Sequence, residues 1–203
     1  MILKNFIVFE GIDGAGTTTQ LKKLTEFIPQ DKLFITAEPS PCETGLFLRK
    51  ILKGDIKLDP KTTAFLFAAD RCEHLYGKNG VSEQTSEGKI CVSDRYLFSS
   101  LAYQSVSCGE KLPKMLNSTF PLPEILFYFV IDPKISLSRV SSRGETTEIY
   151  EKLDYQIKTA ECYEKIISEY EKEDNGMKVI RIDASKSIEE IYHIIKENLP
   201  YLI

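Results

Sequence analysis

The sequence predicts a doubly wound α/β fold in which helices cover both faces of a parallel, five-stranded sheet. Five short apolar runs are nearly continuous rather than alternating, which is typical of strands buried on both faces. Stretches with helical spacing separate these runs. A glycine-rich turn follows the first run, at the end of the sheet where such folds bind ligands. The five runs are residues 6–9, 33–36, 90–93, 125–131 and 179–182.

Strands and helices are expected to alternate along the whole chain. Phe6 to Phe9 forms the first strand, and Leu21, Leu24 and Phe27 recur at helical spacing after the glycine turn. No linker divides the chain, so we expect a single domain over residues 1–203. Further helices are expected at 43–53, 60–78, 97–106, 133–142, 148–173 and 187–198.

Composition narrows the class of protein. With 26 basic and 30 acidic residues the net charge is −4, so no overall positive charge favours nucleic acid or an anionic membrane. The 5 cysteines are scattered without C-x-x-C pairs, which argues against a zinc site or a disulfide framework and is typical of a reducing compartment. The sequence leads us to expect neither a signal peptide nor a membrane-spanning segment. We therefore expect a cytoplasmic enzyme.

Residues 10–18 match a phosphate-binding loop that lacks its lysine. Gly11 and Gly16 have the spacing of G-x-x-x-x-G-K-[ST], and Thr18 takes the hydroxyl position that helps to hold Mg²⁺. Thr17 stands where a lysine would reach the β- and γ-phosphates. A tight turn without a ligand is the alternative, but the strand before the loop and the helix after it favour phosphate binding. The expected ATP contacts in the loop are Gly11, Asp13, Gly14, Ala15, Gly16, Thr17, Thr18 and Thr19.

Motifs beyond the loop carry a specific resemblance. Residues 9–14 read F-E-G-I-D-G, residues 65–74 read F-L-F-A-A-D-R-C-E-H, and residues 93–104 read S-D-R-Y-L-F-S-S-L-A-Y-Q. In this order the motifs make the chain similar to the thymidylate kinase family from residue 5 to about residue 195. The resemblance implies a P-loop nucleoside monophosphate kinase with a lid, which transfers a phosphoryl group from ATP to dTMP with Mg²⁺ and forms a homodimer.

Two residues of the second motif suit recognition of a pyrimidine base. Phe67 can stack on the base, and Arg71 lies on the same helical face, so its guanidinium can reach the base edge. Ordinary core packing is the alternative for Phe67. The resemblance implies that both residues recognise thymine. It also implies dTMP contacts from Asp13, Glu38, Pro39, Arg49, Arg95, Ser99, Ser100, Tyr103 and Gln104.

The phosphate end of the predicted site is formed where strands end. Asp94 resembles the aspartate that positions Mg²⁺ with Thr18, directly or through water. Arg95 can hold phosphate oxygens with paired N–H donors, although an ion pair between Asp94 and Arg95 is the alternative. Arg49 resembles a second acceptor-phosphate arginine, against the alternative of a solvated helix face.

The resemblance also implies roles for Asp13 and Tyr103 at the acceptor sugar. Asp13 would lie by the 3′-hydroxyl and phosphate, and Tyr103 by the sugar ring, where it would disfavour a ribose hydroxyl. Arg95, Asp13 and Arg143 are the predicted catalytic residues.

Residues 139–150 resemble the lid that closes over ATP. Arg139 would lie near the adenine and Arg143 near the transferring phosphoryl group. Glu148 has the opposite charge to that expected in the lid, so a solvated, acidic helix start is the alternative for this segment. Lys22 and Lys23, on the helix after the loop, are expected to point away from the phosphates.

Three functions are compatible with these residues. An active thymidylate kinase is favoured, because losing one preorganised donor typically costs about 3–4 kcal/mol, or roughly 10²–10³ in rate, and leaves a slow enzyme. The second is a dTMP-binding or nucleotide-binding protein with little or no catalysis, because Thr17 replaces the loop lysine. The third is a deoxynucleoside kinase, against which Arg49 and Arg95 argue, because its acceptor lacks a phosphate.

Overall fold

The protein folds around a five-stranded sheet in which all strands are parallel. The structure is a computed structural model that describes residues 1–141 and 152–199. The strand order is β2-β3-β1-β4-β5, which confirms the predicted doubly wound α/β class. The strands are β1 (Ile2–Gly11), β2 (Leu33–Ala37), β3 (Ile90–Asp94), β4 (Leu122–Val130) and β5 (Lys178–Asp183).

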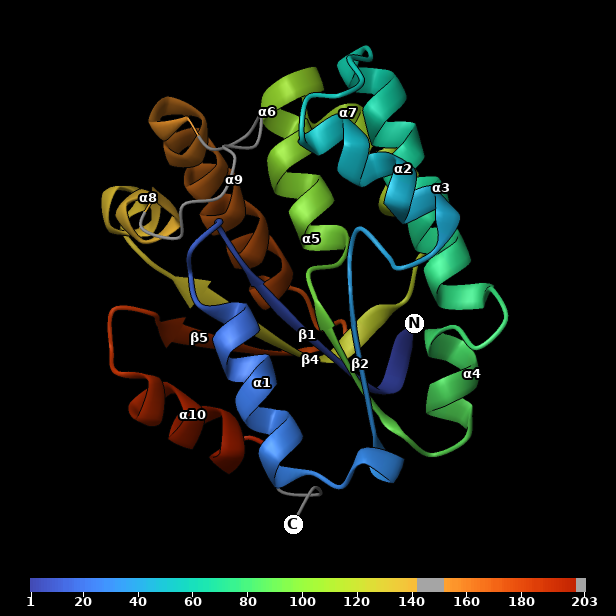
Figure 1. Cartoon of the computed structure of the whole chain (residues 1–203), viewed down its shortest axis with the longest axis vertical. Coiled ribbons are helices and arrows are strands. Elements are labelled where there is room, and N and C mark those ends of the chain that lie inside the picture. Colours follow the sequence, from blue (N-terminus) through green and yellow to red (C-terminus); the bar gives the residue numbers. More distant parts are fainter. Residues whose placement is uncertain (142–151, 200–203) are drawn as a thin grey trace.

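Helices cover both faces of this sheet. Figure 1 shows α1 and α10 together on one side, and α5, α6 and α9 on the other. Within the described ranges no helix is both long enough and apolar enough to cross a bilayer. The helical segments are α1 (Thr17–Phe27), η1 (Gln30–Lys32), α2 (Glu43–Leu52), α3 (Pro60–Tyr76), α4 (Val81–Ser86), α5 (Leu97–Ser99), η2 (Ser100–Gln104), α6 (Ser105–Cys108), α7 (Lys111–Asn117), α8 (Pro133–Ser141), α9 (Leu153–Lys172) and α10 (Ile188–Glu197).

The central strand β1 supplies the middle of the core. Phe6, Ile7, Val8 and Phe9 have no exposed surface, because the sheet is covered on both faces. The ring of Phe9 packs edge-on against that of Phe127 on β4, with centroids 5.3 Å apart. Burial of both faces explains why this strand is a continuous apolar run in the sequence.

Parallel register gathers the loops that bear the predicted site. Phe9 on β1 pairs with Asp94 on β3, and Asp94 pairs in turn with Ala37 on β2. The three strands therefore end side by side at one edge of the sheet. The segments that follow them carry Asp13, Glu38 and Arg95, so residues far apart in sequence meet at one place.

Several expected boundaries differ from the structure. Strand β1 begins at Ile2, before the predicted start at residue 6. The polar residues Lys4 and Asn5 interrupt the apolar run, so the sequence pattern did not reveal the beginning of this strand. Helix α9 begins at Leu153, since Lys152 has an extended backbone, whereas residues 142 and 148–151 of two expected helices lie outside the described ranges. The segment expected as one helix over 97–106 contains a π-helical turn at Ser100–Gln104 and continues to Cys108.

Two short helices had no sequence prediction. Helix α4 contains one large apolar residue, Val81, so it presents no helical periodicity. Helix α7 carries Pro113 in its first turn, where proline is tolerated although it usually indicates a break.

Candidate active site

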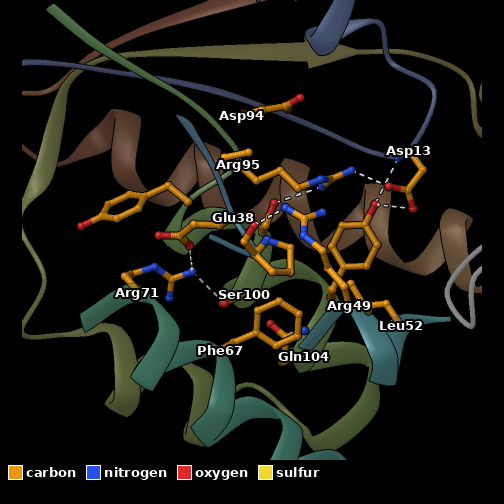
Figure 2. Close-up of a pocket in the computed structure, with 15 residues that line it drawn as sticks. Asp13, Glu38, Arg49, Leu52, Phe67, Arg71, Asp94, Arg95, Ser100 and Gln104 are labelled. Carbon is orange, nitrogen blue, oxygen red and sulfur yellow. Dashed lines mark hydrogen bonds and ion pairs between the residues drawn. The ribbon is translucent and has the colours of Figure 1, made fainter. Parts of the chain in front are cut away.

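One pocket at the strand ends brings together every residue predicted to contact dTMP. Its lining comes from the segments after β1, β2 and β3, from α2 and α3, and from η2. Figure 2 shows these side chains converging from opposite sides of the pocket. The predicted residues that line it are Asp13, Glu38, Pro39, Arg49, Phe67, Arg71, Arg95, Ser99, Ser100, Tyr103 and Gln104, and the lining is completed by Ala37, Leu52, Asp94 and Tyr96.

One part of the pocket lining contains an aromatic ring, that of Phe67. Phe67 lies there half-buried and outside the hydrophobic core, so it is not an ordinary core residue. Gln104 lines the same pocket. The Gln104 Oε1 atom is buried and accepts no hydrogen bond from the described residues. An aromatic face and an unused acceptor in one pocket are a suitable environment for a planar base with an N–H group.

Arg71 is held rigidly in the wall of the same pocket. Its side chain is 1% exposed, and its Nη2 lies 2.6 Å from Glu38 Oε2 and 3.0 Å from Ser100 Oγ. Its Nη1 donates to Asn117 Oδ1, on α7. The buried Nε has no partner among the described residues. The guanidinium is thus fixed by charge-assisted bonds before any ligand arrives.

Residues behind this wall were not expected from the sequence. His74 Nδ1 lies 3.1 Å from Glu38 Oε1, and its Nε2 lies 2.7 Å from Thr36 Oγ1. Asn117, which holds Arg71, carries no sequence signal, because it belongs to the helix that periodicity did not predict. His74 ends the second motif and could have been inferred from it.

Asp70, also in that motif, anchors the segment that leads to Arg49. Its carboxylate accepts hydrogen bonds from Ser40 N at 2.7 Å, Ser40 Oγ at 2.5 Å and Thr44 Oγ1 at 2.7 Å. Arg49 itself lines the pocket and donates to Pro39 O. The peptide bond between Glu38 and Pro39 is cis.

Arg95 forms the charged end of the pocket. Its backbone has a φ of 73°, in the left-handed region that non-glycine residues rarely occupy. The guanidinium Nη1 donates to Gly11 O at 3.0 Å and to Ser99 Oγ at 3.1 Å, and its Nη2 lies 2.5 Å from Asp13 Oδ1. The guanidinium carbon lies 5.2 Å from the centroid of the Tyr103 ring. The alternative reading, an ion pair of Arg95 with Asp94, is not seen among the described residues, where Arg95 pairs with Asp13 instead.

Asp13 joins three elements at the base of the phosphate loop. Its Oδ2 accepts from Gln156 Nε2 at 2.8 Å and from Tyr103 OH at 3.1 Å, while Asp13 N donates to the same Tyr103 oxygen at 3.1 Å. Gln156, on α9, had no sequence signal, since a lone glutamine in an amphipathic helix is usually a surface residue.

Several amide groups at the loop between β1 and α1 have no acceptor among the described residues. Among residues 1–141 and 152–199, the N–H groups of Gly14, Gly16, Thr17 and Thr18 donate to no other protein group. Gly14 and Gly16 have φ values of 83° and 95°, which favour glycine. A Cβ at Gly14 would lie 2.5 Å from Ser136 O, whereas one at Gly16 would meet only open space. Free amides converging on open space at a helix N-terminus can bind phosphate oxygens.

Thr18 and Asp94 lie together as the metal prediction requires. Thr18 Oγ1 donates to Asp94 Oδ2 at 2.8 Å. The described residues contain no cluster of three or more His, Cys, Asp or Glu side chains that could hold a metal alone. A hydroxyl and one carboxylate nevertheless fit Mg²⁺, which keeps several waters and shares phosphate oxygens with its substrate.

The other end of the loop borders a second pocket. Gly14, Ala15, Gly16 and Thr19 line it, and so does Arg139, whose Nη1 donates to Ala184 O at 3.1 Å. Thr17 lines neither this pocket nor the first. Arg143 and the lid after Ser141 lie outside the described residues.

The two lysines that follow the loop on α1 lie in different surroundings. Lys23 pairs with Glu189 at the start of α10, as expected for a lysine that leaves the site. Lys22 is exposed and lines a groove that also includes Thr18, Arg49 and Asp94, so its expected orientation stays a prediction. Positions 18 and 22 are one helical turn apart and share a face of α1.

Comparison with known proteins agrees with this geometry. The family model for thymidylate kinase matches residues 9–195. A protein of Treponema pallidum (strain Nichols) is 42% identical over 98% of this chain and 96% of its own length, and one of Methanocaldococcus jannaschii is 39% identical over 99% and 100%. Both carry provisional thymidylate kinase names. The thymidylate kinase of Leptospira interrogans serovar copenhageni is 38% identical over 92% of this chain and 89% of its own. This chain belongs to the thymidylate kinase family.

Proposed function

We propose that this protein transfers the γ-phosphoryl group of ATP to dTMP, giving dTDP and ADP. In this reaction a dTMP phosphate oxygen forms a bond to the γ-phosphorus, and the bond between that phosphorus and the β–γ bridging oxygen breaks. Family membership supports the reaction class. The single observation that carries the proposal is the pocket in which Phe67, Arg71 and Arg95 lie along one path to the phosphate loop.

The acceptor is proposed to lie with its base beside Phe67 and its phosphate at Arg95. Stacking on Phe67 and donation from a base N–H to Gln104 Oε1 would fix a pyrimidine, while Arg71 borders its edge. Arg95 and Arg49 would hold the phosphate oxygens. A nucleoside would bring no phosphate to Arg49 and Arg95, so the position of both arginines at this end of the pocket argues against a nucleoside acceptor.

Tyr103 and Asp13, which lie between the base end and the phosphate end of the pocket, would contact the sugar. Tyr103 is buried beside Asp13, so a ribose 2′-hydroxyl would meet the tyrosine ring rather than water. This arrangement supports a preference for deoxyribose. The Asp13 carboxylate, which already accepts bonds from Arg95 and Gln156, would accept one more from the sugar 3′-hydroxyl.

The donor is proposed to bind on the loop side. The free amides of Gly14, Gly16, Thr17 and Thr18 would contact phosphate oxygens, and Arg139 would border the adenine in the second pocket. Gly11, Ala15 and Thr19 are proposed to shape the same cradle, and Arg143 to act from the lid. Thr18 and Asp94 would hold Mg²⁺, which neutralises charge on the phosphates when it is bound.

A coupled assay for dTDP tests the proposal. The purified protein is incubated with dTMP and Mg-ATP, with thymidine as the comparison acceptor and with EDTA as the metal-free control. We expect dTDP to form when dTMP is the acceptor and Mg²⁺ is present. We expect no dTDP with thymidine as the acceptor or in the presence of EDTA. Absence of dTDP with ATP, GTP and dATP as donors would refute the kinase proposal.

Replacement of the loop lysine by Thr17 favours one alternative, a dTMP-binding or nucleotide-binding protein with little or no catalysis. Titration calorimetry separates it from the kinase, because binding of dTMP without any dTDP formation would support the alternative. The matched comparison is Arg95→Ala against Arg181→Ala. Arg181 pairs with Glu164 and Glu171 on an exposed surface, so only the first substitution should weaken dTMP binding.

We also propose a single-domain, cytoplasmic homodimer. Helices α2 and α3 lie against one another and expose apolar side chains at Leu46, Phe47 and Phe65, which are 46%, 38% and 53% exposed. A second copy covering this surface would remove it from water. Sedimentation equilibrium tests the dimer, and Phe65→Glu should shift the protein towards the monomer.

A further inference from the structure

A buried carboxylate lies directly behind Arg95 and has no role in the proposed reaction. Glu10 is the last charged residue of β1 and has no exposed surface. One of its oxygens, Oε1, accepts from the backbone N–H groups of Tyr96 at 2.8 Å and Ser99 at 3.1 Å. It thereby joins β1 to the turn that follows β3 and bears Arg95.

The second oxygen of Glu10 faces two hydroxyl groups. Oε2 accepts from Ser99 Oγ at 2.7 Å and from Tyr163 OH at 2.8 Å. Both hydroxyl oxygens lie on the guanidinium side as well, since Arg95 Nη1 donates to Ser99 Oγ at 3.1 Å and to Tyr163 OH at 3.4 Å. Two hydroxyls thus stand between a buried carboxylate and the arginine of the acceptor phosphate.

The direction of these hydrogen bonds follows from the charge of Glu10. A carboxylate can only accept, so it draws the hydroxyl protons of Ser99 and Tyr163 towards Oε2. Their lone pairs are then turned towards Arg95 and accept its N–H groups. A group at the same position that donates hydrogen bonds would compete with Arg95 for those lone pairs.

We propose that Glu10 is a positioning residue that holds the Arg95 guanidinium in its phosphate-binding orientation through the hydroxyls of Ser99 and Tyr163. The inference rests on the proposed function, in which Arg95 binds the acceptor phosphate. Glu10 touches neither substrate. Its effect reaches the reacting groups only through Arg95.

The pH range in which Glu10 is charged depends on its burial and on the charged and titratable groups around it. Burial raises the pKa of Glu10 to about 7, although the hydrogen bonds from Ser99 and Tyr163 and the nearby Arg95 oppose this rise. The other titratable side chains that face it are Tyr163 on α9, Tyr96 after β3 and Tyr128 on β4, whose pKa values burial also raises. These tyrosines stay neutral, so Glu10 itself is the group that changes charge near neutral pH.

The variant Glu10→Gln tests the inference with little change in size. Its amide oxygen can still accept from Tyr96 N and Ser99 N, which leaves an NH₂ group in the place of Oε2. At pH 8 we expect the Kd for dTMP, measured by calorimetry without ATP, to rise roughly tenfold, the effect of losing one hydrogen bond to a charged group. The kcat should fall by a similar factor, and the KM for ATP should stay within about twofold.

A pH profile separates positioning from a purely structural role. In the wild-type protein kcat should rise through an acidic limb near pH 7, as Glu10 ionises. In Glu10→Gln this limb should be absent, and kcat should stay at the low value. Equal dTMP affinities and the same acidic limb in both proteins would overturn the inference.

A second variant guards against a folding defect. Tyr163→Phe leaves Glu10 and its backbone contacts in place but removes one of the two connecting hydroxyls. We expect its dTMP Kd to rise about threefold, in the range of a neutral hydrogen bond. An affinity equal to that of the wild type would overturn the role of Tyr163 and with it the inference. The calorimetric comparison does not require turnover, so a wild-type protein that binds dTMP without forming dTDP refutes the proposed kinase activity alone.

Discussion

Arg95 Nη2 lies 2.5 Å from the carboxylate of Asp13, and both side chains remain partly exposed at the mouth of the pocket. Asp13 belongs to the loop after β1, whereas Arg95 follows β3 and lines the pocket proposed to bind the acceptor. The ion pair therefore joins the two halves of the site. In the proposed complex, a bound phosphate would share Arg95 with Asp13 rather than meet an unpaired cation.

Replacing Asp13 with asparagine should slow the reaction more than it weakens the fold. The amide keeps the size of the side chain but loses the charge that holds Arg95. We expect kcat to fall about 10–100-fold, which corresponds to a loss of roughly 1.4–2.7 kcal/mol. Steady-state kinetics with dTMP measures the effect, and Asp31→Asn on the exposed η1 is the control. A change of less than threefold in Asp13→Asn would contradict this role.

The substitution Thr17→Lys should raise the rate. A lysine at this position adds the ammonium group that normally contacts the β- and γ-phosphates, and one such group is worth roughly 10²–10³ in rate. We expect kcat to increase at least tenfold. Thr17→Met, which has a long but uncharged side chain, is the matched control. If both variants have the wild-type rate, other groups already supply the missing charge.

Phe67→Ala should weaken dTMP binding while kcat changes little. Stacking of a base on an aromatic ring is worth about 1–3 kcal/mol, so the Kd for dTMP should rise roughly 5–150-fold. Tyr76→Ala provides the comparison, because Tyr76 lies on the same helix, is 57% exposed and does not line the pocket. Equal affinities in the two variants would place the base elsewhere.

Arg71→Met should destabilise the protein. The substitution leaves the carboxylate of Glu38, which is 3% exposed, without its charged partner. Breaking a buried pair in this way typically costs about 3–5 kcal/mol, measured here as the free energy of unfolding in urea. The double variant with Glu38→Gln should recover part of this loss, since no charge then remains buried. Additive losses would show that the pair is not coupled.

The ionisation of Glu10 should make the fold less stable as pH rises. Burial raises the folded-state pKa of Glu10 from 4.5 to about 7, so the folded state holds the proton more tightly than the unfolded chain does. This contribution is fully present below about pH 4.5 and is lost as pH rises through about 7. Between pH 5 and pH 8 the free energy of unfolding should fall by about 2–3 kcal/mol relative to Glu10→Gln. A constant difference between the two proteins over this range would disprove the raised pKa.

Sequence patterns predicted the sheet because the strands are buried on both faces. The runs at 33–36 and 90–93 differ from β2 and β3 by a single residue at the end, since a continuous apolar run has little freedom in its limits. The positions of Glu38 and Asp94 followed, because parallel strands end at one edge. Helices α4 and α7 were not predicted, because α4 has no apolar periodicity and Pro113 in the first turn of α7 indicates a break.

The candidate site was predictable where its residues belong to compact motifs. Phe67 and Arg71 lie one turn apart on α3, so their shared face was visible in the spacing. Gln156 and Tyr163 were not, because they meet Asp13 and Glu10 only when α9 packs beside η2. The motif gives the positions of Thr17 and Glu10. It does not show whether other groups replace the charge missing at Thr17, or whether Glu10 is ionised.

The left-handed backbone of Arg95 implies a trade-off between stability and activity. A non-glycine residue in this conformation typically raises the free energy of the folded state by about 1–2 kcal/mol, and a glycine would remove most of that strain. Arg95→Gly would also lose every contact of the guanidinium with Gly11, Ser99 and Asp13. Glycine would therefore strain the backbone least at this position, but it has no side chain to bind the phosphate. Selection for thermal stability alone would drive this position away from arginine, and only selection for phosphate binding would keep it there.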